Sequence, residues 1–316
     1  MNEIGGYFGL EELIHNEYYP NLVAVNTARN ALLYLVKAKG VRKLYLPYYL
    51  CDSVANLCHR EGIAYEQYRI TPDFLPIFDR VPERGAYLYV VNYYGQLDES
   101  TVRKLQAQYH NLILDNVQAF FEQPVQGVDT IYSCRKFFGV PDGAYLATDV
   151  KLPEELPLDV SMERMRHILG RYEGVSANAY YADFKANDRS FADLPLRAMS
   201  KLTHNILGAI NYEAAKARRE QNFAFLHERF GGRNRLKLNP PPGPYAYPFY
   251  CENGMEVKKR LAEQKIYVPT LWPNVLDLDG TIEKDYAENI LPLPCDQRYG
   301  AAEMERICAE LEEGRS

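Results

Sequence analysis

The sequence of 316 residues has no long apolar run and no excess of positive charge. No apolar stretch approaches the roughly 18 residues that a membrane-spanning helix needs. The formal net charge of -6 gives no electrostatic reason to expect nucleic acid or an anionic membrane as a partner. The first residues, Met1 to Gly6, lack the basic and apolar regions of a signal peptide. We therefore expect a cytoplasmic protein that binds neither nucleic acid nor membrane.

Several binding motifs are also missing. The six cysteines form no CxxC pair and the six histidines form no HExxH spacing, so we predict no metal site. Neither GxGxxG nor GxxxxGK(S/T) occurs, which argues against a dinucleotide-binding fold and a P-loop. What is abundant is tyrosine: 26 of them favour buried or interfacial aromatic surface, and hence an oligomer.

Short apolar runs alternate with helical patterns through the first half of the chain. The predicted strands are residues 22–25, 43–46, 64–69, 86–92, 112–115, 129–132 and 144–147. Near-continuous apolar strands separated by helices indicate a largely parallel sheet that is covered on both faces. Ligands of such sheets bind at the carboxyl ends of the strands. The predicted fold class is therefore α/β.

The second half of the chain has a different pattern. Residues 153 to about 231 are helical, including one amphipathic run from Leu196 to Phe230, and a proline-rich linker follows from Asn239 to Pro244. A strand, a helix, a further strand at 266–268 and a last helix then form a small α/β domain. We predict three parts: an N-terminal arm at 1–20, a large domain at 21–235 and a small C-terminal domain at 236–316.

Lys136 lies in an apolar loop between two predicted strands, next to Cys134, Phe137 and Phe138. Two interpretations are open on these residues alone. An amine that loses water among aromatics has a lowered pKa and becomes a nucleophile towards carbonyls. Alternatively, the lysine stem lies on the aromatics while the amine reaches solvent.

Two other segments place polar groups at strand ends or helix starts. Asn26 and Thr27 begin a helix whose free backbone N–H groups could hold an anion, although an ordinary capped helix has the same pattern. Asp115 ends a buried strand and needs a partner, which could be the N–H of a pyridinium ring or simply the next backbone turn. Lys136 follows Asp115 by 21 residues, close enough in the topology for both to reach one crevice.

Phosphate segment, acid and lysine occur in the order found in fold-type-I pyridoxal phosphate enzymes, and the chain resembles the DegT/DnrJ/EryC1/StrS aminotransferase family. Asn26 to Leu32 resembles the family's S-G-T-A-A-L segment, and Asp115 to Ala119 resembles D-x-x-(H/Q)-A. Ser133 to Lys136, with Asp142 and Gly143, resembles the lysine segment. Weaker likenesses complete the ordered set: Leu46 to Cys51, Asn92 to Gln96 and Glu288 to Pro294.

This resemblance implies a pyridoxal phosphate-dependent transferase of fold type I, with a large domain, a small C-terminal α/β domain and a homodimer whose active site lies near the subunit interface. Lys136 would form the Schiff base with pyridoxal 5'-phosphate and move the substrate proton. Asp115 would pair with the pyridinium nitrogen, and Gln118 would bind the cofactor's 3-oxygen. Thr27, Ala28 and Ser133 would hold the phosphate.

The chain also departs from the family pattern. Ala28-Arg29 stands where a Gly-Thr pair is usual, and Cys51 stands where many relatives carry the aromatic that stacks on the ring, a role that could pass to Tyr49 or Tyr93. The G-Y-N-x-R segment by which a second subunit contacts the phosphate is missing. The region 172–200 is our expected replacement, with three candidate contacts: Asn178, Tyr180 and Ser200.

The predicted function is transfer of an amino group from a small-molecule donor such as glutamate to a keto acceptor, by family analogy a nucleotide-linked keto sugar. Two alternatives stay open at this point. Another fold-type-I reaction, such as a lyase or decarboxylase reaction, would use the same lysine and acid. A regulatory protein could bind pyridoxal phosphate without turnover.

Overall fold

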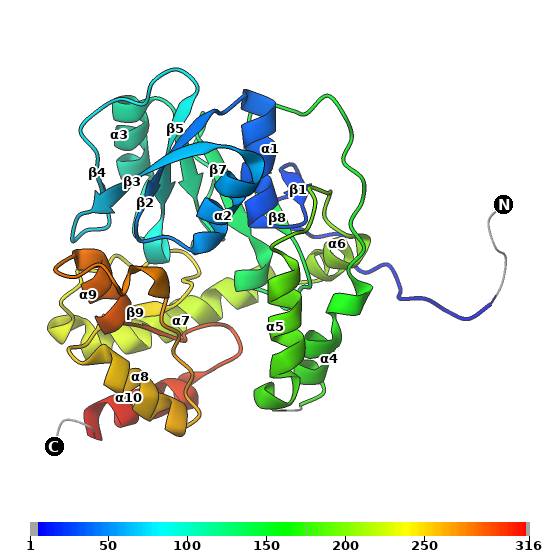
Figure 1. The fold of residues 1–316 in the computed structure, drawn as a ribbon. Coiled ribbons are helices and arrows are strands. Elements are labelled where there is room, and N and C mark those ends of the chain that lie inside the picture. Colours follow the sequence, from blue (N-terminus) through cyan, green and yellow to red (C-terminus); the bar gives the residue numbers. More distant parts are fainter. Residues whose placement is uncertain (1–5, 175, 314–316) are drawn as a thin grey trace.

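A computed structural model describes residues 6–174 and 176–313. Its centre is an eight-stranded sheet in the order β1-β8-β7-β6-β5-β2-β3-β4 (Figure 1). The strands are β1 Val23–Val25, β2 Lys43–Pro47, β3 Ala64–Ile70, β4 Pro76–Ile77, β5 Ala86–Val91, β6 Leu112–Asp115, β7 Asp129–Ser133 and β8 Ala144–Ala147. Four neighbouring pairs are parallel, from β3 through β2, β5 and β6 to β7, and the pairs at the two edges are antiparallel. The predicted, largely parallel sheet is confirmed.

Helices cover both faces of this sheet. The chain runs from β2 through α2 (Asp52–Glu61) to β3 and from β5 through α3 (Glu99–Tyr109) to β6. These crossovers lead in opposite directions along the sheet, so right-handed connections place α2 and α3 on opposite faces. Helix α1 (Ala28–Lys39) packs beside α2.

The boundaries of α1 follow from its sequence. The Thr27 side chain accepts a hydrogen bond from the Asn30 N–H, which caps the first turn. At the other end Gly40 adopts a left-handed conformation with φ of 62°.

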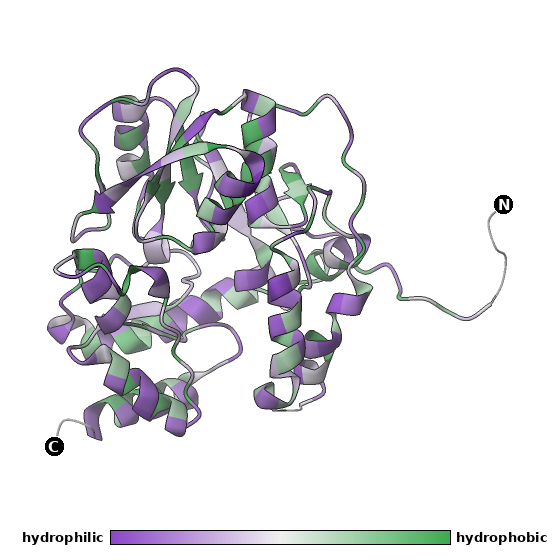
Figure 2. Ribbon diagram, in the orientation of Figure 1, coloured by the Kyte–Doolittle hydropathy of each residue, from purple (hydrophilic) through white to green (hydrophobic). Residues whose placement is uncertain are grey.

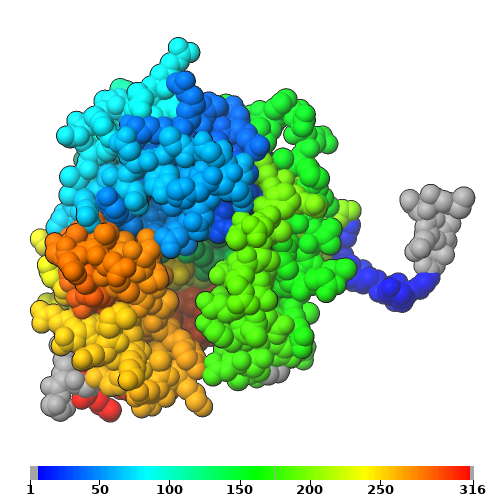
Figure 3. Space-filling model, in the orientation of Figure 1, coloured from blue at the N-terminus to red at the C-terminus, as the bar shows by residue number. Residues whose placement is uncertain are grey.

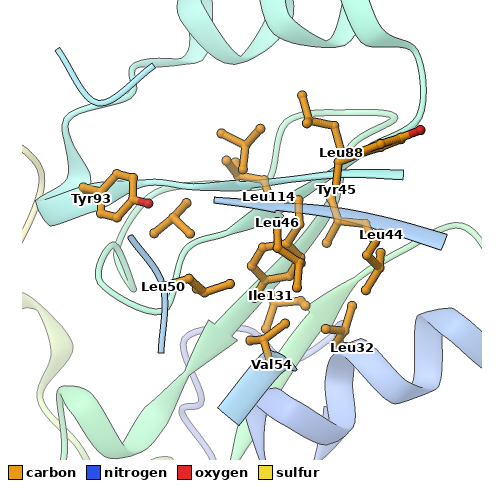
Figure 4. Close-up of a cluster of buried hydrophobic side chains, with 14 of the residues drawn as sticks. Leu32, Leu44, Tyr45, Leu46, Leu50, Val54, Leu88, Tyr93, Leu114 and Ile131 are labelled. Carbon is orange, nitrogen blue, oxygen red and sulfur yellow. The ribbon is translucent and has the colours of Figure 1, made fainter. Parts of the chain in front are cut away.

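The main core lies between the sheet and these helices. Apolar residues line the strands, and hydrophilic residues gather on the outer sides of the helices (Figure 2). Leu32 of α1 and Val54 of α2 meet Leu44, Leu46 and Ile131 of the sheet (Figure 4). These side chains are nearly or fully buried, as expected for a sheet with both faces covered.

The segment after β8 contains α4 Arg166–Tyr172, α5 Tyr181–Ser190, α6 Lys201–Gly208 and α7 Tyr212–Phe230. The expectation of one run from Leu196 to Phe230 is wrong, because the helix breaks between α6 and α7. Asn211 restarts it by accepting a hydrogen bond from the Ala214 N–H. A polar side chain that caps a new helix competes with continuation of the old one.

The last part of the chain forms a second, smaller layer. Strands β9 (Tyr247–Tyr250) and β10 (Ile290–Leu293) pair antiparallel, and α8 Gly254–Glu263, α9 Ile282–Asn289 and α10 Ala301–Glu313 accompany them. The core of this layer also takes Phe223, Leu226 and Phe230 from α7. The expected strand at 266–268 is wrong: Ile266 and Val268 are buried, but they lie in irregular chain. The apolar residue types alone had suggested a strand there.

Among the helices described, none combines the length and apolar character that a membrane crossing requires.

Candidate active site

The carboxyl ends of three parallel strands bring the predicted polar groups together. In the sheet register Val91 of β5 pairs with Asp115 of β6, which pairs with Ile131 of β7. The chain after each strand is tied to its neighbour. Asn92 donates its N–H to the Asp115 carbonyl at 3.0 Å, and Asn116 donates to the Ile131 carbonyl at 2.8 Å. Side chains that leave these strand ends therefore share one edge of the sheet, as the sequence predicted.

Asp115 is buried, with 4% of its surface exposed. The Tyr89 hydroxyl donates to its Oδ2 at 2.7 Å, and the Val117 N–H donates to its Oδ1 at 2.9 Å. Burial raises the pKa of this carboxyl, while the two hydrogen bonds and the positive charge of Lys136 oppose that rise. Asp115 is thus a buried acid held in place by neutral donors, with Lys136 near enough to act on it electrostatically.

Lys136 ends a short 3-10 helix, Cys134–Lys136, directly after β7. Its side chain is exposed, and its Nζ lies 5.5 Å from the centre of the Tyr245 ring. The neighbouring aromatics therefore do not enclose this amine in the single subunit. Phe137 and Phe138 turn into a buried aromatic cluster instead. The lysine keeps contact with solvent, as in the second of the two interpretations.

The start of α1 and the end of β7 flank the same strand. Val25 and Ser133 both pair with Ala144 of β8, so they are two strand spacings apart, about 10 Å. The Gly143 N–H donates to the Asn26 carbonyl at 2.7 Å. This bond links the lysine loop, residues 134–143 between β7 and β8, to the chain before α1. Thr27 and Ser133 are both buried at this edge. The two predicted phosphate segments are therefore neighbours, with Ala28 in the first turn of α1.

Gln118 holds a donor that no described residue uses. Its Oε1 accepts a hydrogen bond from the Tyr94 N–H at 2.9 Å. Its Nε2 is buried and has no hydrogen-bond partner among the residues described. Because buried donors without a partner cost free energy, this amide is suited to a bound acceptor.

A buried polar network holds the end of the lysine loop at Asp142. Asp142 is fully buried and accepts hydrogen bonds from the Ser200 N–H at 3.0 Å, from the Ser200 hydroxyl at 2.7 Å and from the Thr203 hydroxyl. The next residue, Gly143, has φ of 112°, and a Cβ there would lie 2.9 Å from Thr203 Cγ2. Only glycine fits this turn without strain. Ser200 is thus committed within its own chain, and the expectation that it contacts a second subunit is wrong.

This network predicts a stability effect. Asp142→Ala should lower the free energy of unfolding by about 2 to 4 kcal/mol, because one N–H and two hydroxyls lose a buried acceptor. Urea unfolding followed by circular dichroism measures it. Thr203→Val removes one of these donors only and should cost less. Equal stability of Asp142→Ala and the natural protein would contradict the role of this network.

A second network holds the residue after the lysine. Arg219 of α7 is buried and donates from Nη2 to the Phe137 carbonyl at 3.1 Å. Gln297 donates to the same carbonyl at 2.7 Å and accepts from Arg219 Nε at 2.6 Å. The Arg219 guanidinium also lies 4.5 Å from the centre of the Phe137 ring. The chain after β10 therefore fixes the backbone beside Lys136.

The residues on the two sides of Lys136 contact two different parts of the chain. Figure 3 shows a cleft between the green residues around 160–200 and the yellow and orange residues around 250–275. Arg135 lies near α5 on one side, with its Nη2 3.9 Å from Asp188 Oδ1, and Phe137 binds Gln297 on the other. The exposed amine of Lys136 therefore lies between the contact of Arg135 with α5 and that of Phe137 with the chain after β10.

The candidate stacking residues lie in two settings. Tyr49 and Tyr93 are buried together, with ring centres 5.4 Å apart, and both contact Trp272. Cys51 is exposed and precedes α2, without a side-chain hydrogen bond to that helix. Asn178 is exposed, and Tyr180 is partly buried, in a short 3-10 helix before α5. Their roles stay predictions.

Four residues that shape this site were not predicted from the sequence: Tyr89, Arg219, Tyr245 and Gln297. None of them lies in a recognisable motif. The fold brings them to the site, from up to 160 residues away along the chain. Tyr89 carries the only signal that was readable, since it points to one face of β5 two residues before the strand ends.

Comparison with known proteins finds its matches among solved structures. DesV of S. venezuelae, in complex with a ketimine intermediate, is 17% identical; the match covers 92% of this chain and 84% of that one, with a TM-score of 0.62. A DegT DnrJ EryC1 StrS aminotransferase from Brucella abortus is 13% identical over 92% of this chain and 85% of that one, with a TM-score of 0.61.

The PLP form of Spr1654 from Streptococcus pneumoniae, described as a "putative sugar aminotransferase", is also 13% identical, over 92% and 86% of the two chains, with a TM-score of 0.60. No family model and no curated protein matches the sequence. At these identities the likeness is one of fold. The chain has the fold of fold-type-I, pyridoxal phosphate-dependent aminotransferases. Within that class, its fold is like that of the DegT/DnrJ/EryC1/StrS sugar aminotransferases, which confirms the predicted fold and, at the level of the fold, the predicted resemblance.

Proposed function

We propose that this chain is a pyridoxal phosphate-dependent aminotransferase. The observation that carries the proposal is a buried acid and an exposed amine that follow neighbouring strands, with the amine close enough to act on the acid electrostatically: Asp115 and Lys136. The fold it shares with DesV and Spr1654 supports the same conclusion. Fold alone would not carry a reaction, but a strand-end acid, an adjacent amine and an unused amide donor together favour this chemistry.

The residues present fit this cofactor. Gln118 Nε2 is a buried donor without a partner in the described chain, which suits the ring's 3-oxygen. Asp115 has neutral hydrogen-bond partners and can accept a further N–H, as a protonated ring nitrogen requires. The start of α1 offers backbone N–H groups to the phosphate, with Thr27 and Ser133 beside it. Tyr49, Tyr93 and Cys51 are the proposed neighbours of the ring face.

When bound, pyridoxal phosphate supplies an electron-withdrawing ring that stabilises negative charge on the substrate carbon and carries the amino group. The protein supplies the rest. Lys136 Nζ would hold the cofactor covalently and would take or return a proton at the substrate carbon. Asp115 would stabilise the positive charge on the ring nitrogen from a buried position, where its charge is weakly screened. The Phe137 carbonyl, fixed by Arg219 and Gln297, limits movement of the lysine backbone.

The proposed substrates are glutamate as the amino donor and a nucleotide-linked keto sugar as the acceptor. The resemblance to the sugar aminotransferase family supports this assignment, as do neighbours that are described as sugar aminotransferases. We propose the cleft of Figure 3 as the entry for both substrates.

We also propose a homodimer whose active site lies near the subunit interface. Large apolar side chains are exposed on the N-terminal arm and in the 158–184 segment, including Tyr7, Phe8, Ile14, Leu169 and Tyr172. Exposed apolar surface of this extent is typical of protein interfaces. The arm extends away from the body of the subunit, where it can reach a second copy (Figure 1).

A spectrum of the cofactor-loaded protein tests the reaction. Addition of glutamate should bleach the absorption band of the lysine-bound cofactor, because the amino donor releases the cofactor from Lys136. Glutarate has both carboxylates but no amine, so it should leave the band unchanged. An unchanged band with glutamate would contradict aminotransfer from this donor, and a band that changes only with loss of carbon dioxide would favour a decarboxylase.

A further inference from the structure

Two arginines that the proposed mechanism does not use stand beside the phosphate segments. Arg29 is the second residue of α1, two residues after Thr27. Arg135 lies between Cys134 and Lys136, two residues after Ser133. The two segments lie on opposite sides of β8, so the sequence alone does not predict that their arginines contact a common residue.

Phe191, just after α5, contacts both guanidinium groups. Arg29 donates a hydrogen bond from Nη1 to the Phe191 carbonyl. The Arg135 guanidinium carbon lies 3.9 Å from the centre of the Phe191 ring, a stacking distance. The loop after α5 crosses the start of α1, where Asn30 donates to the carbonyls of Leu194 and Pro195 at 3.2 and 2.9 Å (Figure 1).

Positive charge at this place is only partly balanced. Arg164 also approaches the Phe191 ring, at 5.9 Å, but it pairs with Asp159 at 2.7 Å. The carboxylate nearest to Arg135 is Asp188, which is half exposed and 3.9 Å away. Burial lowers the pKa of Arg135 to about 10, and the nearby Arg164 and Arg29 add to this effect.

Arg29 also has an unused donor. Its Nε is shielded from solvent and has no hydrogen-bond partner in the described part of the chain. A planar guanidinium with a free N–H, set beside the amino end of a helix, is suited to a tetrahedral dianion. Chloride or a carboxylate would use this geometry less fully than a phosphate group.

We propose that Arg29 and Arg135 form a phosphate-binding pair at the start of α1. The pair takes the phosphate of the cofactor and makes up, from within the subunit, for the missing segment by which a second subunit would contact it. The assignment of the phosphate to the cofactor rests on the proposed function, whereas phosphate binding by the pair does not.

The first measurement uses inorganic phosphate on the cofactor-free protein. Phosphate should raise the melting temperature of the natural protein, relative to chloride at equal ionic strength, and should lose most of this effect in Arg29→Gln/Arg135→Gln. Arg166→Gln/Arg171→Gln is the matched control, since both are exposed arginines of α4 and their removal changes the charge equally. Equal stabilisation of all three proteins by phosphate would overturn the proposal.

The second measurement compares pyridoxal 5'-phosphate with pyridoxal, which lacks the phosphate. The double variant should bind pyridoxal 5'-phosphate about 10- to 100-fold more weakly, as expected for loss of charge-assisted hydrogen bonds, and pyridoxal equally well. Equal weakening for both compounds would mean that the arginines only cap the end of α5, and would overturn the cofactor assignment. If the natural protein bound neither compound, the proposed function would fail, while the inorganic phosphate result would still decide the site.

A third variant separates folding from binding. Phe191→Leu removes the ring on which Arg135 stacks but keeps the carbonyl that Arg29 binds. It should lower the melting temperature while retaining most of the stabilisation by phosphate. Loss of the phosphate effect in this variant, with both arginines present, would show that the effect follows the packing of α5 and not the two charges.

Discussion

Lys136→Ala should abolish covalent attachment of pyridoxal phosphate to the protein. Borohydride reduces the bond between the cofactor and a lysine amine to a stable one, so mass spectrometry of the reduced natural protein should show the added cofactor on Lys136. The alanine variant has no amine at this position and should carry none. Turnover should fall to background with it, because no other side chain at this strand end takes over the proton at the substrate carbon.

The variant itself should fold normally. Lys136 is exposed and its amine makes one ring contact, with Tyr245, so its removal leaves no buried group unpaired. Lys185→Ala serves as the control, since Lys185 is another lysine whose amine lies over a ring, that of Tyr181 on the same helix. Its labelling should match the natural protein. Persistent attachment of cofactor to folded Lys136→Ala would show that another amine is the attachment site.

The parts of the site that could be predicted from sequence are those that local chemistry determines. Asp115 stands at the end of a continuous apolar strand, and such strands end at the ligand-binding edge of a parallel sheet. The start of α1 was readable from Thr27 and its end from Gly40. These elements are specified by neighbours within a few residues, so a single sequence contains the information.

What could not be predicted depends on pairs that are distant in the chain. The hydrogen bonds to the Phe137 carbonyl come from Arg219 and Gln297, and neither donor lies in a motif. The meeting of Arg29 and Arg135 at Phe191 is of the same kind. The exposure of Lys136 could not be decided from the sequence, because its apolar neighbours, Phe137 and Phe138, turn away from it into the core.

Asp115→Asn should preserve the fold but slow turnover by about 100-fold or more, the effect of removing one preorganised charge from a reacting centre. An asparagine has nearly the same shape, and its carbonyl oxygen can still accept a hydrogen bond from Val117 or Tyr89. It is neutral, however, and cannot stabilise a protonated ring nitrogen. We expect kcat to fall even when the cofactor is saturating. The free energy of unfolding, measured with urea, should change by only about 1 kcal/mol.

Tyr89→Phe provides the comparison that isolates the charge. It removes the hydrogen bond to Asp115 Oδ2 but leaves the carboxylate, so its loss of rate should be several-fold and well below that of Asp115→Asn. Unimpaired turnover in Asp115→Asn would show that this acid is not the partner of the ring. Equal losses in the two variants would mean that the position of the side chain, and not its charge, is what the reaction requires. A large loss for asparagine with a small one for phenylalanine is the result that the buried, neutrally supported carboxylate predicts.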